Sequence, residues 1–469
     1  MPRRTEGGQA SGVAAPAPAR PSDAVRAHAD RMERRLAEDG LALRDLGVLE
    51  TDDPAAALFL GAVERGFYEQ VPTGEHLRQV LAGHAADGRR RLGVWERDAA
   101  PAATAPVGTF EDFVQPLTTW PGRTVDAWLI SDVTVSPGHR RRGILRAMML
   151  RSLADAARAG LAVAALTASE AAIYGRFGFG AATRWRRVHV DVRHAPELTG
   201  PETEGTVVPA DPRAIGSLVD GLYQRVRLLH PGTVQRTASY LPRWEDRSLS
   251  RNEGKGSGLF AAVHRDPAGE VQGVALYRFA GWETEPITVT VEAFLAATAD
   301  ARRGLLRFLA RLDLVQRLSW ERAPGPGWVE AMFVDERRVR ADRGGDDLYL
   351  RVLDVPAAMA GRGHRTDGTA VVAVSDPLGP ADGVWRLAVE DGRGSAERLG
   401  PAASAADLGA ETAMGVDRFS ALWLGGAERG AGAAVLAEAG VVRELAPGGA
   451  DRLDALLAPL RPLHSLTGF

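Results

Sequence analysis

The sequence predicts a mixed α/β protein that folds as several domains. The chain has 469 residues, which is more than one ordinary domain holds, so roughly two to four domains are expected. Segments with the helical spacing of apolar residues alternate with short segments rich in β-branched and aromatic residues. A polar stretch with proline and glycine at 194–205 separates one such series from the next. We therefore expect an N-terminal tail over 1–21 and domains over 22–194, 195–355 and 356–469.

The tail and the first domain have distinct patterns. Residues 1–21 are rich in alanine, proline, glycine and serine, with no apolar core behind their basic start, so we expect disorder and no export signal. The elements expected next are a helix over 24–40, a strand over 41–50, a helix that begins at Asp53 and Pro54, a hairpin formed by 91–98 and 105–117, and a long strand over 126–135.

The two later domains are also mixed. Residues 195–355 again show both helical and strand patterns. In the third domain the expected elements are strands over 369–376 and 384–391 and a helix over 450–460, followed by a short tail. Three α/β units in succession are therefore predicted.

The composition excludes several classes of function. A formal net charge of −3 argues against broad electrostatic binding to nucleic acid. The absence of cysteine removes disulfides, thiolate metal ligands and a cysteine nucleophile, and it is compatible with a cytoplasmic location. No stretch offers about 18 consecutive apolar residues, so no membrane span is expected. The histidines show no paired metal-ligand spacing, so we expect no metal.

The first functional signal is VTVSPGHRRRGILRAMMLRSL, residues 133–153. A predicted strand enters a turn with arginines at 140–142 and a glycine, Gly143, and a helix that buries one face follows at once. The first N–H groups of such a helix have no acceptor within it, and the helix dipole adds positive charge there. Gly143 lets another group approach the backbone, and the arginines offer charge-assisted hydrogen bonds. The turn therefore suits a pyrophosphate.

A solvated basic turn explains the same spacing equally well. No GxxxxGK[ST] sequence is present, and GKGSG at 254–258 lacks that spacing, so nucleotide hydrolysis is not expected. Downstream residues decide between the alternatives. An apolar run at 161–168, compatible with a buried strand, leads into SEAAIYGRFGFGAAT at 169–183.

The order of these motifs resembles that of the GNAT acetyltransferases. It is V-x-V, then R-R-x-G-x-L opening a helix, then a buried strand, then S-E-x-x-I-Y-G-R-F-G-F-G. More narrowly, IYGRFGFG is similar to the enhanced intracellular survival (Eis-like) family of aminoglycoside N-acetyltransferases, and LYLRVLDVPAAM at 348–359 resembles the junction to that family's C-terminal domain. The resemblance implies two GNAT-like acetyltransferase domains followed by a sterol-carrier-protein-like α/β domain, assembled as a homohexamer.

The resemblance also implies roles for individual residues, with acetyl-CoA as co-substrate and no metal. The residues that would contact acetyl-CoA are Val133, Thr134, Val135, Arg141, Arg142, Gly143, Ile144, Leu145, Arg146, Ser169 and Glu170. Tyr174 matches the general acid that protonates the departing CoA thiolate. Phe469 matches the terminal residue whose α-carboxylate acts as base on the attacking amine. Without the resemblance, Tyr174 would be a packing aromatic beside Phe177 and Phe179.

Two further segments bear on the substrate. Glu64 and Glu69, which flank Phe67, are candidates for attracting a cationic substrate, although such residues more often decorate a helix surface. The sequence ARRGLLRFLARLD at 301–313 repeats the pattern of the basic turn and its helix. No V-x-V-x-P precedes it and no IYGRFG follows it, so we expect the second GNAT-like domain not to bind acetyl-CoA.

The expected function is acetyl-CoA-dependent N-acetylation of an aminoglycoside-like or polyamine substrate, by direct transfer within a ternary complex in the cytoplasm, with antibiotic resistance as an implied role. The alternative is a lipid- or ligand-binding protein that uses the carrier-like C-terminal domain and retains only a vestigial acetyltransferase site. The expected partners are a small-molecule amine and further copies of the chain, and no nucleic acid.

Overall fold

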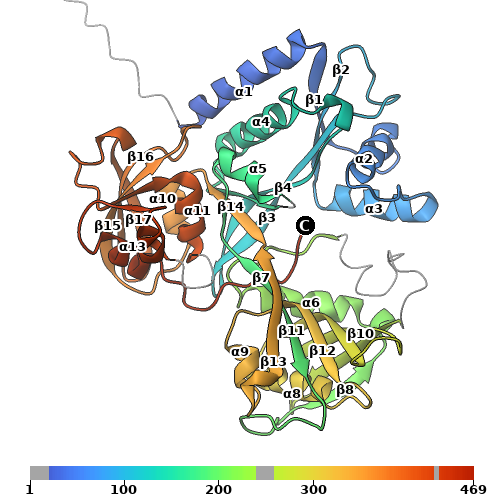
Figure 1. Cartoon of the computed structure of the whole chain (residues 1–469). Coiled ribbons are helices and arrows are strands. Elements are labelled where there is room, and N and C mark those ends of the chain that lie inside the picture. The colour runs from blue at the N-terminus through green and yellow to red at the C-terminus, as the bar shows by residue number, and fades with distance from the viewer. Residues whose placement is uncertain (1–20, 169, 239–257, 427–431) are drawn as a thin grey trace, which may run out of the picture.

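The chain forms three units, each built on one β-sheet (Figure 1). The computed structural model describes residues 21–168, 170–238, 258–426 and 432–469. The tail expected over 1–21 therefore lies outside the described residues except for its last position. Within the described parts of the chain, no helix combines the length and the apolar character needed to cross a membrane.

The first sheet has seven strands in the order β1-β2-β3-β4-β5-β14-β6. They are β1 (Leu41–Val48), β2 (Arg90–Glu96), β3 (Gly108–Trp120), β4 (Arg123–Val135), β5 (Val163–Thr167), β14 (Leu348–Val352) and β6 (Gly180–Ala181). Strands β1 to β4 form an antiparallel meander, and β5 joins β4 in parallel after a crossover. The strand, the hairpin and the long strand expected from the sequence are present.

Helices cover this sheet on both faces. They are α1 (Pro21–Glu38), α2 (Pro54–Gly66), α3 (Gly74–Ala86), α4 (Ile144–Arg158) and the single turn α5 (Ala171–Tyr174). Helix α2 begins where the sequence predicts, because the Asp53 carboxylate accepts a hydrogen bond from the N–H of Ala55 and Pro54 needs no acceptor. Helices α1 and α4 lie side by side (Figure 1) and bury Leu36 and Leu153 in one apolar cluster.

The second sheet also has seven strands, in the order β13-β7-β12-β11-β10-β9-β8. They are β13 (Val339–Asp346), β7 (Arg184–Asp191), β12 (Arg317–Ala323), β11 (Thr288–Ala296), β10 (Val271–Phe279), β9 (Leu259–Arg265) and β8 (Thr206–Ala210). Its helices are α6 (Gly216–Arg227), α8 (Ala299–Ala310) and the short α9 (Trp328–Ala331). Strands β11 and β12 pair in parallel, as β4 and β5 do.

The two large sheets exchange a strand. Strand β7 follows β6 in sequence but pairs with β12 and β13 of the second sheet. Strand β14 follows β13 but pairs with β5 and β6 of the first sheet. The two sheets are therefore each completed by a segment on the far side of the sequence boundary at 194, which couples their folding.

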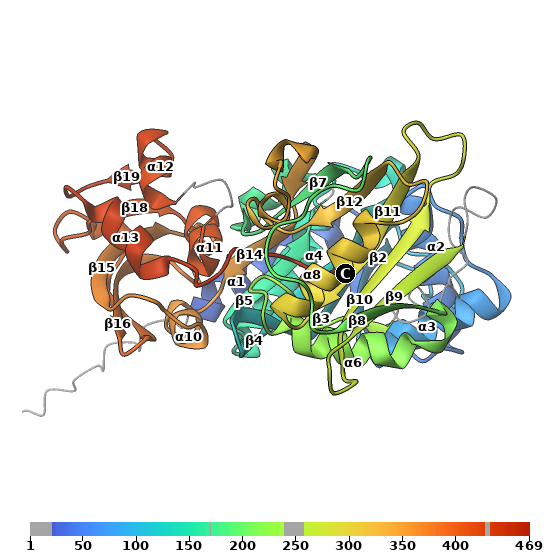
Figure 2. The same ribbon diagram turned by 90° about the horizontal axis from the view of Figure 1, so that it is seen from below.

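The third unit has a five-stranded sheet in the order β17-β16-β15-β18-β19. Its strands are β15 (Gly368–Ser375), β16 (Gly383–Glu390), β17 (Arg393–Gly400), β18 (Thr412–Gly415) and β19 (Arg443–Glu444), and its helices are α10 (Val355–Gly361), α11 (Val416–Leu424), α12 (Ala433–Glu438) and α13 (Gly449–Leu457). Figure 2 shows this unit beside the first one, with α11 next to β14, where the Ser420 hydroxyl accepts a hydrogen bond from the N–H of Val352.

The residues after α13 leave the third unit and run back between the two large sheets (Figure 1). The N–H of His464 donates to the carbonyl of Pro231 at 3.0 Å, and the Thr233 hydroxyl donates to the carbonyl of His464 at 2.6 Å. The segment that holds this tail is itself paired with β3, through the isolated bridge between Leu117 and Val234. The last residue, Phe469, is thereby carried to the first sheet.

Candidate active site

The first sheet opens between β4 and β5. The two strands pair in parallel from Ala127 with Val163 to Ile130 with Leu166, after which β4 continues to Val135 without a partner on that side. A register shift between β3 and β4 lies at the same point, and Asp132 there has a φ of 52°. This irregularity turns the end of β4 away from β5. The N–H and carbonyl groups on the β5 side of 131–135 are therefore not used by the β4–β5 ladder.

A cavity of about 350 Å³ fills the opening. Its lining residues are Phe67, Ile130, Ser131, Asp132, Val133, Leu166, Thr167, Ala168, Tyr174 and Phe469. The predicted residues Val133, Tyr174 and Phe469 thus meet at one cavity, although more than half of the chain separates α5 from the last residue. Among the described residues that line this cavity, Asp132 carries an acidic side chain and none carries a cationic one.

Tyr174 lies at the end of α5 and is 8% exposed. Its ring meets the ring of Phe179 edge to face, with centroids 6.4 Å apart. Burial, and to a smaller degree the charge of Glu170, raises the pKa of the Tyr174 phenol above its ordinary value. The phenol is therefore protonated at neutral pH and can act as a proton donor into the cavity.

Phe469 is held at the cavity by both its ring and its backbone. The ring packs edge to face on Phe113, with centroids 6.2 Å apart and planes at 88°. A main-chain oxygen of Phe469 lies 3.5 Å from the hydroxyl of Thr167, at the end of β5. The α-carboxylate expected from the sequence to act as base therefore lies at the splayed end of β5.

The basic turn lies at the start of α4, as the sequence predicts. Gly143 is the N-terminal cap residue with a φ of 82°, and Arg141 before it also has a positive φ, of 67°. No side chain caps this end of the helix, so its first N–H groups are available to a ligand. The guanidinium of Arg142 donates to the carbonyl of Asp39 at 2.7 Å and so ties the turn to the end of α1.

A second cavity, of about 250 Å³, lies beside this turn. The described residues that line it are His28, Arg31, Met32, Arg35, Arg141, Gly143, Arg146 and Leu150, and none of them is acidic. Half of the lining comes from α1, whose His28, Arg31 and Arg35 recur at spacings of three and four residues and so share one helix face. Sequence reasoning missed these residues, although a basic helical face ahead of a basic turn was a readable signal.

A buried ionic network adjoins the first cavity. Glu111 contacts Arg89 at 3.3 Å, Arg91 at 3.0 Å and His84 at 3.3 Å. Arg89 also lies 3.7 Å from Asp132. Burial, and then the charge of Glu111, raises the pKa of Asp132 to about 6. Asp132 is thus a cavity carboxyl group that titrates near neutral pH, and the sequence analysis did not single it out.

The same network contains three groups of the kinds that bind metals. Ligand atoms of His84, Glu111 and Asp132 lie within 4.8 Å of one another. Two guanidinium groups already balance the charge of Glu111, from Arg89 and Arg91. We therefore interpret the cluster as an ionic support for Asp132.

The other predicted residues have varied positions. The Thr134 hydroxyl is hydrogen-bonded to the Thr109 hydroxyl at 2.7 Å, and Ile144 is buried at the start of α4. Phe67 lines the first cavity, whereas Glu64 and Glu69 are not among its lining residues. Val135 is the last residue of β4, Leu145 and Arg146 lie in the first turn of α4, and Glu170 is at the N-cap position of α5. Ser169 lies outside the described residues.

Comparison with protein families matches three successive parts of the chain. Residues 59–182 and 232–352 each match a model described as an acetyltransferase (GNAT) domain, and residues 355–465 match a sterol carrier protein domain. This order confirms the fold class predicted from the sequence.

Relatives extend over most of the chain. An N-acetyltransferase named Eis from Mycobacterium tuberculosis is 34% identical over 349 residues, which cover 72% of this chain and 80% of the relative. An uncharacterised N-acetyltransferase from Streptomyces avermitilis is 35% identical over 362 residues, 75% of this chain and 83% of the relative. Among solved structures, Eis1 from Mycobacterium abscessus superposes with a TM-score of 0.75 at 25% identity, covering 91% of this chain and 100% of that one.

Proposed function

The chain belongs to the Eis family of GNAT N-acetyltransferases, and on that premise we propose that it transfers the acetyl group of acetyl-CoA to an amine of an aminoglycoside-like or polyamine substrate. The observation that supports an amine substrate is the lining of the first cavity. Its described residues combine aromatic rings, the Asp132 side chain and a main-chain carboxylate, without a cationic side chain. Such a lining favours a protonated amine over an anion.

Acetyl-CoA is assigned to the opening between β4 and β5. The acetyl and pantetheine part lies along Val133 to Val135, where main-chain N–H groups not used by β5 polarise the thioester carbonyl. The pyrophosphate lies at the start of α4, against the uncapped N–H groups and the side chains of Arg141 and Arg146. These placements are supported by the two cavities, which lie at the strand end and at the helix start.

The proposed chemistry is direct transfer within a ternary complex. The α-carboxylate of Phe469 takes a proton from the substrate ammonium, and the freed lone pair attacks the thioester carbonyl carbon. As the tetrahedral intermediate collapses, the C–S bond breaks, and Tyr174 protonates the departing thiolate. The nitrogen loses its second proton, which returns through solvent to the Tyr174 phenolate, so the products are the neutral amide and the CoA thiol. No acyl-enzyme is needed, and the chain has no cysteine to form one. Holding both reactants in one cavity supplies much of the rate.

Asp132 is assigned to binding the amine. Its ionised carboxylate lies in the same cavity as Tyr174 and Phe469 and is supported by Arg89. An anion in a half-enclosed cavity attracts a cationic substrate at short range. Glu64, Glu69 and Phe67 remain assigned to the outer part of the amine path, since Phe67 lines the cavity and the two glutamates flank it in sequence.

The assembly and the location are further parts of the proposal. We assign a homohexamer and a cytoplasmic location, both implied by membership of the family. The alternative function, ligand carriage by the C-terminal unit, has weaker support. A cavity there, lined by residues such as Ala405 and Met414, has about 250 Å³, which is below the range of about 300–1,000 Å³ usual for small-molecule sites.

The test is an acetylation screen with the full chain. Acetyl-CoA and a panel of aminoglycosides, polyamines and lysine peptides are incubated with the protein, and products are read by mass spectrometry. We expect acetylated polyamine or aminoglycoside products. We also expect CoA to be released only when the amine is present. Binding of acetyl-CoA without acetylation of any amine on the panel would contradict the proposal.

A further inference from the structure

The second sheet contains a counterpart of the opening between β4 and β5. Strands β11 and β12 pair in parallel from Thr288 with Arg317 to Val291 with Trp320, after which β11 continues to Ala296 without β12 as a partner. Helix α8 connects them, as α4 connects β4 and β5. The two units therefore share one architecture, and each opens at the end of its parallel pair.

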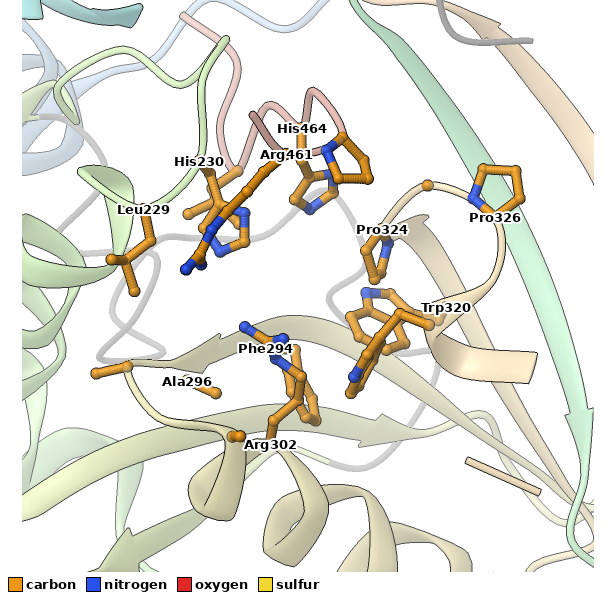
Figure 3. A pocket seen from close by; sticks show the side chains of 16 residues that line it. Leu229, His230, Phe294, Ala296, Arg302, Trp320, Pro324, Pro326, Arg461 and His464 are labelled. Atoms are coloured by element: carbon orange, nitrogen blue, oxygen red, sulfur yellow. The ribbon is translucent and has the colours of Figure 1, made fainter. Parts of the chain in front are cut away.

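The second opening holds a cavity of about 540 Å³, larger than the cavity at Tyr174. It is lined by residues of β11, the start of α8, the segment after β12, the segment after α6 and the C-terminal tail. Figure 3 shows that the side chains of Arg302, from α8, and Arg461, from the tail, extend into the same space.

The charge of this cavity in the second sheet is opposite to that of the cavity at Tyr174. Of the sixteen described residues that line the cavity in the second sheet, none is acidic, whereas two are arginines. Among the described residues, neither Arg302 nor Arg461 forms an ion pair with a carboxylate. Both guanidinium groups lie in this one cavity, and burial, and then the charge of Arg461, lowers the pKa of Arg302. An anion between them would relieve this repulsion.

Two histidines add hydrogen-bonding groups without adding charge. The rings of His230 and His464 meet with centroids 5.7 Å apart, and His464 is only 7% exposed. Burial lowers the pKa of His230 to about 4 and that of His464 to about 3, so both rings are neutral at pH 7. A neutral imidazole offers one donor and one acceptor.

Aromatic rings form another wall of the cavity. The ring of Phe294 lies 4.8 Å from that of Trp320, and the ring of Trp328 lies 6.0 Å from Trp320 at a near-perpendicular angle. The guanidinium of Arg302 sits over the Trp328 ring at 5.3 Å. These flat apolar surfaces suit a planar or apolar body next to the charged group.

We propose that this cavity is a second ligand site, which binds an aromatic anion with its carboxylate or phosphate between Arg302 and Arg461 and its ring against Phe294, Trp320 and Trp328. The proposal does not depend on the assignment of acetyl transfer to the first unit. Acetyl-CoA itself does not fit the start of α8, because the Thr298 hydroxyl already accepts the N–H of Ala301 and Asp300 adds negative charge there.

The test titrates the full chain with four probes that share a naphthalene ring and differ in the charge of their substituent. They are 2-naphthoate, 2-naphthyl phosphate, the neutral 2-naphthalenemethanol and the cationic 2-naphthylmethylamine, each titrated by calorimetry in the absence of acetyl-CoA. We expect one or both anions to bind at least about tenfold more tightly than the neutral alcohol. The stronger of the two identifies the preferred acid group.

Variants locate the site. Arg302→Met and Arg461→Met keep an apolar side chain and remove one charge each, and each should weaken the preferred anion about tenfold or more. Arg303→Met is the matched control, because Arg303 is on the same helix, pairs with Asp300 at 3.3 Å and does not line the cavity. It should leave anion binding unchanged.

Two outcomes would overturn the proposal. One is that neither anion binds more tightly than the alcohol. The other is that anion binding survives in the Arg302→Met, Arg461→Met double variant. Acetyl-CoA titration of every variant serves as the folding control, because that site lies in the other sheet.

Discussion

The hydroxyl of Thr167 lies 3.5 Å from a main-chain oxygen of Phe469, although 302 positions separate the two residues. Thr167 ends β5 at the point where β5 parts from β4. The contact therefore brings the last residue of the sequence to the splayed end of the first sheet. Because the tail reaches this point by crossing the second unit, the proposed active site depends on all three units.

Replacing Tyr174 with phenylalanine tests the proton donor. The substitution keeps the ring on Phe179 and removes only the hydroxyl. Since a thiolate leaves fairly easily, we expect turnover to fall toward the lower end of the about 10²–10⁴-fold range of acid–base catalysis. The affinity for acetyl-CoA should hardly change. Steady-state kinetics together with calorimetry separates the two effects. Unchanged turnover would make Tyr174 a packing residue.

Asp132 predicts a pH dependence of amine binding. Its pKa is raised to about 6 in the folded chain, so the side chain is anionic above pH 6 and neutral below it. The KM for a polyamine should therefore rise as the pH falls from 7 to 5, while the amine itself stays protonated throughout. In the Asp132→Asn variant the KM should be high and flat over this range. A wild-type KM that does not change between pH 5 and 7 would contradict the assignment.

The arginines of α1 predict a contribution to acetyl-CoA binding from outside the basic turn. Arg31 and Arg35 line the cavity next to Gly143 and are exposed to solvent. Each should therefore contribute less binding free energy than an arginine in a buried ion pair. We expect Arg31→Met and Arg35→Met each to weaken acetyl-CoA roughly three- to tenfold. The loss should shrink at high salt, because salt screens exposed charges.

Arg34→Met is the matched control for this prediction. Arg34 is exposed on the same helix, but it is not among the residues that line the cavity. Calorimetry at two salt concentrations measures all three variants. An equal loss in the Arg34 variant would mean that only the general charge of α1 matters, and no loss in any variant would remove α1 from the site.

The parts of the site that could be predicted are those encoded locally. The turn around Gly143 and the segment ending at Tyr174 are contiguous stretches, in which helix-start chemistry and glycine spacing act over a few residues. Phe469 could be predicted only through the family resemblance, because no local pattern places a chain end. The assembly of these residues at one cavity follows from the splayed strands.

The parts that could not be predicted depend on contacts between distant segments. Asp132 acquires its raised pKa from burial and then from the charge of Glu111 on the neighbouring strand, and neither is visible in its own sequence context. The exchange of β7 and β14 between sheets changes no local pattern, since either sheet would bury the same apolar strands. The cavity of the second sheet combines Arg302 and Arg461, which only the path of the tail brings together.

The proposed base at the chain end gives the most demanding prediction. Adding residues after Phe469 replaces its α-carboxylate with a neutral amide. Folding should survive, because the tail lies outside the three sheets. Acetyl-CoA binding should also survive, because its assigned residues lie at the end of β4 and around the start of α4. Amine acetylation should fall by about 10²–10⁴-fold, as expected for the loss of a positioned base. Steady-state rates with a polyamine substrate measure the effect.

Steric blockage of the cavity by the added residues would produce the same loss, so deletion of Phe469 is the companion variant. It adds no bulk, yet it withdraws the carboxylate by up to about 3.5 Å along the chain and removes the ring that packs on Phe113. If the carboxylate is the base, both variants lose acetylation while keeping acetyl-CoA affinity. If both acetylate at the parent rate from pH 6 to 9, the base is another group, and Asp132, the acidic side chain that lines the same cavity, is the first to substitute.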